Sequence, residues 1–97
     1  MVSFSEGVID EIKRASTKTD VKTVVEGSFS RLKEMQIFNE SRYVMNMIVC
    51  LRSMKMEGLE SEVINNLNAA LELFRQYKMK NHQRLFWYIE RIELLNP

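Results

Sequence analysis

The chain has 97 residues, of which fourteen are basic and thirteen acidic, so its net charge is only +1. This length fits a single domain, residues 1–97, and the near-neutral charge removes the electrostatic argument for a nucleic-acid ligand that a basic domain would give. One cysteine, Cys50, excludes an internal disulfide and predicts a buried, reduced thiol in a cytoplasmic protein.

The amino-terminal half of the chain predicts three helices. Ser3 and Glu6 have the spacing of a capping box, and the apolar residues that follow recur at helical intervals until the polar run 16–20. A second helix is predicted from Val21 to about Phe38. Asn39 is a suitable cap for a third helix that extends through Met56, with Gly58 just beyond its end.

The carboxyl-terminal half predicts two more helices. Apolar residues recur at helical spacing from Val63 to Tyr77, and again from Leu85 to Leu95. Asn81 between these runs is interpreted as the cap that starts the fifth helix. The predicted fold is therefore all-α, a small bundle of about five helices with a short first helix and two helical hairpins, at about 20–56 and 60–95.

A weak internal similarity supports the two hairpins. Residues 21–50 align with residues 63–92 at a constant offset of 42, and apolar residues meet apolar residues at most core positions. Helix-pair repeat proteins have a period of about this length, because one hairpin cannot bury its apolar face alone. Two unrelated amphipathic hairpins would align in the same way, so both origins stay open.

The third predicted helix is apolar on nearly all sides. Between Ser41 and Met56 there is no acidic residue, and the apolar residues occupy more than one face. This pattern is typical of a central helix packed on two sides, or of a surface that awaits a partner. Met45 and Met54 are the candidate contacts, either for a protein partner or for a second copy of the chain.

Basic and aromatic residues alternate in residues 73–89, where no acid occurs. Such a stretch can bind nucleic acid through phosphate contacts and base stacking, but it is also typical of a solvated basic face beside packed rings. Trp87 lies off the apolar stripe of its helix and is a candidate anchor for a protein partner. The candidate binding residues here are Arg75, Lys78, Lys80, Arg84 and Trp87.

Catalytic and metal-binding patterns are weak. One histidine and one cysteine do not supply the ligands of a zinc or iron–sulfur site, and the mid-helix position of Cys50 disfavours a reactive thiolate. The longest apolar stretch, residues 43–51, is too short to cross a membrane. We therefore predict a non-catalytic protein-interaction module without metal or cofactor, with nucleic-acid binding through residues 75–84 and a homodimer through the third helix as alternatives.

Overall fold

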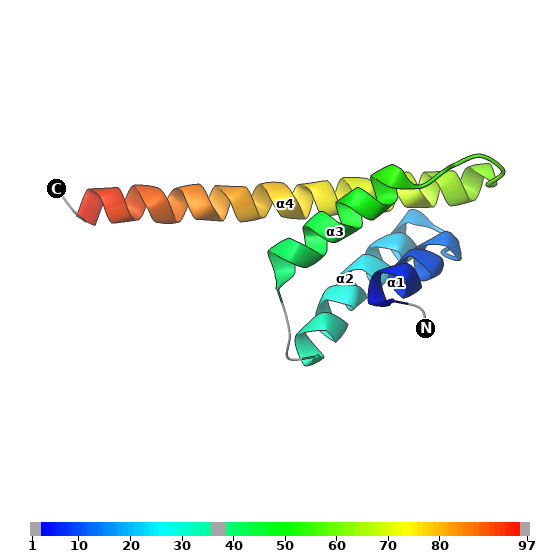
Figure 1. The fold of residues 1–97 in the computed structure, drawn as a ribbon, viewed down its shortest axis with the longest axis horizontal. Helices are drawn as coiled ribbons and strands as arrows, with labels where there is room; N and C mark the ends of the chain where they lie inside the picture. The colour runs from blue at the N-terminus through cyan, green and yellow to red at the C-terminus, as the bar shows by residue number, and fades with distance from the viewer. Residues whose placement is uncertain (1–2, 36–38, 96–97) are drawn as a thin grey trace.

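Four α-helices account for most of the chain that the structure describes, residues 3–35 and 39–95. In this computed structural model they are α1 (Phe4–Lys13), α2 (Lys18–Glu34), α3 (Glu40–Ser53) and α4 (Ser61–Leu95) (Figure 1). Side chains are described as far as Lys80. These ranges contain no strand, so the predicted all-α class is confirmed.

Three helices begin at polar residues that cap their first turns. The Ser3 hydroxyl accepts a hydrogen bond from the Glu6 backbone N–H at 3.2 Å, and the Glu6 carboxylate accepts one from the Ser3 N–H at 3.4 Å. Asn39 caps α3 as predicted, and Thr17 in the polar run caps α2. Each cap satisfies a backbone N–H that has no carbonyl partner within its own helix.

The helices pack as two antiparallel pairs, α1 with α2 and α3 with α4 (Figure 1). α4 also contacts α1 and α2, so its first half is the element against which the other three helices pack. Its second half extends past them (Figure 1). This projection explains the elongated shape of the molecule, 58 × 27 × 23 Å, because a helix of 35 residues is about 52 Å long.

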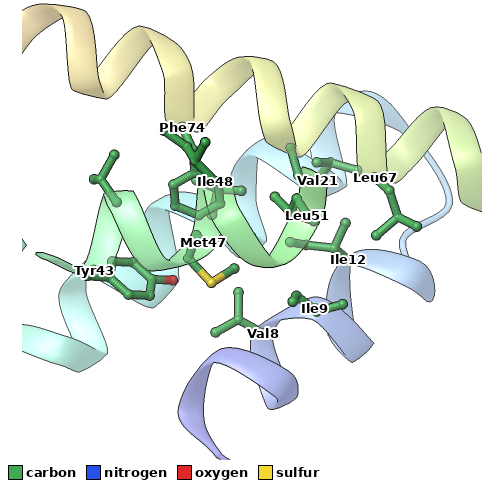
Figure 2. Close-up of a cluster of buried hydrophobic side chains, with 13 residues drawn as sticks. Val8, Ile9, Ile12, Val21, Tyr43, Met47, Ile48, Leu51, Leu67 and Phe74 are labelled. Carbon is green, nitrogen blue, oxygen red and sulfur yellow. The ribbon is translucent and has the colours of Figure 1, made fainter. Parts of the chain in front are cut away.

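All four helices contribute to one apolar core (Figure 2). Phe74 of α4 lies at its centre, with its ring centroid 5.8 Å from that of Tyr43 and 6.0 Å from that of Phe29. Met47 of α3 points toward Val8 of α1 (Figure 2). The buried apolar residues are Val8, Ile9, Ile12, Val21, Val25, Tyr43, Val44, Met47, Ile48, Leu51, Leu67, Ala70 and Phe74.

Three side-chain hydrogen bonds satisfy polar groups in and beside this core. The Tyr43 hydroxyl donates to the Ser28 hydroxyl at 2.6 Å, which in turn donates to the Val25 carbonyl at 2.6 Å. The Asn66 side-chain amide donates to the Ala15 carbonyl at 2.7 Å. No buried side-chain polar atom in the described part of the chain lacks a partner, as stable packing requires.

The predicted break at Asn81 is wrong. The backbone from Ser61 to Leu95 is a single helix, so there are four helices within the described residues, and no hairpin forms over 60–95. An asparagine lowers helix propensity by less than 1 kcal/mol, about as much as a serine does, and neither glycine nor proline occurs in this segment. The 42-residue similarity therefore relates a hairpin, α2 and α3, to a continuous helix.

The third helix is shorter than predicted. It ends at Ser53, and Met54 has an extended backbone with ψ 136°. From there the chain turns so that Met54, Met56 and Leu59 pack against the core, which a continued helix would prevent. Gly58, with φ 80°, makes the turn in this connection, where residues other than glycine are strained.

Candidate functional site

α3 has a buried side and an exposed side. The buried side chains of α3 recur three and four residues apart, and they face α1, α2 and α4 (Figure 2). The sequence left two interpretations open, a central helix packed on two sides and a surface that awaits a partner; the structure shows one packed face and one exposed face. The buried residues are Tyr43, Val44, Met47, Ile48 and Leu51.

The exposed side carries a line of residues that we name the α3 ridge: Arg42, Met45, Val49 and Arg52. These residues are separated by three, four and three positions, so they follow one another along the same face of a helix. Met45 is 41% exposed and Val49 56% exposed, which places two adjacent apolar side chains in solvent. The two arginines at the ends of the ridge form no ion pair with any described residue.

A groove runs between α3 and α1 beside the α3 ridge. Its volume is about 310 Å³, and its walls include Ile9 and Met54, which give it an apolar interior. Cys50 lies on the α3 wall and is exposed, so the predicted buried thiol is wrong. The α1 wall carries two acidic side chains, Glu6 and Asp10, and one basic side chain, Lys13.

The basic residues of α4 lie on two different sides of the helix. Lys80 lines a groove against α2, with its ammonium nitrogen 5.9 Å from the centre of the Tyr77 ring. The helical repeat places Arg75 and Lys78 on the other side of Phe74, the side along which α3 packs. Arg75 is exposed and Lys78 is half-buried. The basic stretch is therefore not one continuous surface.

The remaining sequence candidates fall outside the described side chains. Arg84 and Trp87 belong to the projecting half of α4, and so does His82. Of the candidates that can be placed, Met45, Arg75 and Lys78 lie on the α3 side of the molecule, and Met54 contributes to the groove beside the α3 ridge. Lys80 does not join them.

Val49 and the groove wall at Ile9 were missed by the sequence reasoning. Val49 lies in an apolar run, where composition gives no indication of which members face solvent. The spacing from Met45 indicates that the two residues share a face, but only the packing of α1 and α4 shows that this face is the open one.

The described residues include no cluster of metal-ligating side chains. No three histidine, cysteine, aspartate or glutamate residues among them are close enough to hold a metal ion. The clearest pKa shifts are upward, for the phenols of Tyr43 and Tyr77, chiefly because burial disfavours the phenolate. Both residues therefore stay neutral near pH 7, where Tyr43 acts as a hydrogen-bond donor within the core.

Comparison with known proteins identifies no relative: the chain matches no protein-family model, no curated protein and no solved structure. Among the described residues, none of the helices combines the length and the hydropathy that a membrane span requires.

Proposed function

We propose that this chain is a non-catalytic protein-interaction module that binds its partner through the α3 ridge. The observation that carries the proposal is the exposure of Met45 and Val49 side by side on a helix whose opposite face is fully packed. Interface cores are built from such apolar residues surrounded by polar ones, and methionine adapts to the shape of a partner. The groove beside Cys50 adds a recess for one partner side chain.

The α3 ridge is also suited to binding because its geometry is fixed before any partner arrives. Five buried side chains on the opposite face of α3 hold the helix against the bundle. Association then orders few additional groups, and this lowers the entropic cost of forming a complex. Replacement of the ridge residues should consequently change binding without changing the fold.

Affinity capture from an extract of the source cell tests the proposal. The baits are the wild-type chain, a variant with Met45→Ser and Val49→Ser, and a control with Met79→Ser, since Met79 is 63% exposed on α4 and lies outside the α3 ridge. Quantitative mass spectrometry should find proteins that bind wild type and the control but not the ridge variant. Equal capture by all three baits would refute a role for the α3 ridge.

Nucleic-acid binding is the second candidate function. It is favoured by the unpaired Arg42 and Arg52 together with Arg75 on the neighbouring side of α4. A labelled oligonucleotide, titrated at two salt concentrations, should then bind more weakly at high salt and after joint replacement of Arg42, Arg52 and Arg75. Unchanged affinity in that triple variant would exclude this arginine surface as the site.

A cytoplasmic location is consistent with the exposed thiol and remains part of the proposal. Cys50 has no disulfide partner within the chain, and a reducing compartment keeps such an exposed thiol free.

A further inference from the structure

Positive charge is concentrated along the α3 ridge, and this distribution indicates the kind of partner that the ridge selects, if it binds protein as proposed above. We infer that the partner is an amphipathic helix that places an apolar stripe on Met45 and Val49 and carries acidic residues along one edge. Arg42 and Arg52 lie at the two ends of the apolar pair, and no acid occurs between Ser41 and Met56. Both guanidinium groups are exposed and without an ion-pair partner among the described residues.

The flank of α4 beside α3 extends this basic edge. Arg75 is exposed there and Lys78 is partly exposed, so two cationic side chains of α4 add to the two arginines of the ridge. Carboxylates on a partner helix would be attracted to this edge, and arginine can bind them with two parallel hydrogen bonds. Electrostatic complementarity of this kind fixes the orientation of a partner as well as its rate of association.

The opposite edge of the surface has mixed charge with an acidic excess. Glu6, Asp10 and Lys13 of α1 border the groove beside Cys50, and two carboxylates against one ammonium group disfavour acidic side chains there. The partner helix therefore carries its acids toward α4 and neutral or basic residues toward α1. An apolar side chain from the partner fits the groove, which Ile9 and Met54 line and whose volume is about 310 Å³.

A second copy of the chain fits this surface poorly. A two-fold axis through two antiparallel α3 helices places Arg42 of one copy near Arg52 of the other, and a parallel arrangement pairs each arginine with itself. Both arrangements place ridge arginines of the two copies opposite one another, and the antiparallel one also brings the two basic α4 edges together, whereas the parallel one sets the α1 edge of one copy against the α4 edge of the other. Nucleic acid also fits less well, because phosphate contacts do not use Met45 or Val49 and these side chains offer no ring for base stacking.

The test is selection from a displayed library of helical peptides about five turns long. All peptides share one apolar stripe, and the positions on either side of it are randomised among glutamate, glutamine and lysine. The full chain is the target. Enriched peptides are then titrated by fluorescence anisotropy against wild type and three double variants: Arg42→Glu with Arg52→Glu, Met45→Ser with Val49→Ser, and Lys18→Glu with Lys22→Glu.

The lysine variant is the matched control, since it changes the net charge by the same amount at exposed positions of α2. We expect the enriched peptides to carry glutamate along one edge. The affinity for these peptides should fall about tenfold or more in the arginine variant, because a few close charge pairs account for a change of this size, and it should decrease as the salt concentration rises. It should fall by a similar factor in the methionine–valine variant, which loses the apolar contact, and remain unchanged in the control.

Two outcomes separate the inference from the proposed function. Enriched peptides that are neutral or lysine-rich but still require Met45 and Val49 would overturn the acidic partner and leave the function standing. Enriched peptides that bind the methionine–valine variant as tightly as wild type would overturn both the inference and the proposed function. The same holds if no peptide is enriched.

Two further measurements address the other occupants. If light scattering detects a dimer that is lost in the methionine–valine variant, the partner of the α3 ridge is a second copy of the chain and not an acidic helix. Binding of a mixed-sequence oligonucleotide that requires the two arginines but not Met45 or Val49 would replace it with nucleic acid.

Discussion

Two methionines on α3, two residues apart and therefore on opposite sides of the helix, provide the sharpest test of the division between core and surface. Met47 is fully buried and points toward Val8 of α1 (Figure 2), whereas Met45 is 41% exposed. We predict that Met47→Ala lowers the free energy of unfolding by about 2–5 kcal/mol, since a buried methionine leaves a cavity when it is truncated. Met45→Ala should change it by no more than about 0.5 kcal/mol, the usual range for surface substitutions.

The size of the Met47 effect is large for a protein of this length. A chain of 97 residues has a total stability of about 5–15 kcal/mol, so Met47→Ala removes a substantial fraction of it. The midpoint of thermal unfolding should fall by roughly 10 °C or more, since about 1 kcal/mol corresponds to 4–8 °C in a small domain. Both residues are methionines in the same helix, so differences in helix propensity cancel.

Urea unfolding followed by far-ultraviolet circular dichroism measures both variants under the same conditions. The slope of the unfolding transition should be the same in both, because neither substitution changes the amount of surface exposed on unfolding by much. Equal destabilisation by the two variants would refute the reasoning, since it would mean that Met45 is covered in the folded protein. The same Met45→Ala variant should show weaker capture of the proposed partner.

Three further predictions concern the helices and the core. Asn39→Ala should lower the free energy of unfolding by about 1 kcal/mol because it removes a helix cap, whereas Asn81→Ala, inside the continuous α4, should leave it unchanged or raise it slightly. Urea unfolding of both variants measures this difference. An equal loss in the two variants would mean that Asn81 also caps a helix. Gly27→Ala should raise the free energy of unfolding by about 0.5–1 kcal/mol, and with it the melting temperature. The added methyl group meets no atom within 4 Å, and alanine favours the helix. Because burial raises the pKa of Tyr43, the contribution of this residue to the free energy of unfolding is fully present below pH 10 and is lost as the pH rises through the folded-state pKa. Tyr43→Phe should remove this loss of stability at alkaline pH. Urea unfolding over a pH series measures it, and the same pH profile in the variant as in wild type would contradict the prediction.

Most of the fold follows from local signals in the sequence. The capping box at Ser3 and the cap at Asn39 are confirmed: in each, the side-chain oxygen accepts a hydrogen bond from the backbone N–H three residues later. Asn81 has the same side chain as Asn39, but it lies inside a helix and starts none. Neither glycine nor proline occurs between Ser61 and Leu95, so nothing in the neighbouring sequence ends the helix at Asn81, and the residue lies within it.

The candidate surface could be predicted only in part. Composition identified the third helix as unusually apolar and free of acids from Ser41 onward, and it identified Met45 as a candidate contact. It did not show that Cys50 is exposed or that Val49 accompanies Met45, because the number of faces that a helix buries depends on where its neighbours lie. The basic stretch was treated as one surface, although the helical repeat distributes Arg75 and Lys80 to different sides of α4.

The division of α3 into two faces also explains how one short helix can support both the fold and the proposed binding. Its inner face packs Tyr43, Met47 and Leu51 into the core, and the Tyr43 hydroxyl is held by Ser28 of α2. Because the outer face makes little contribution to that packing, residues there are free to be apolar or charged without loss of stability. A helix that is fixed on one side and exposes two apolar side chains on the other is suited to be a preformed half of an interface, and the acidic partner helix that we propose would supply the other half.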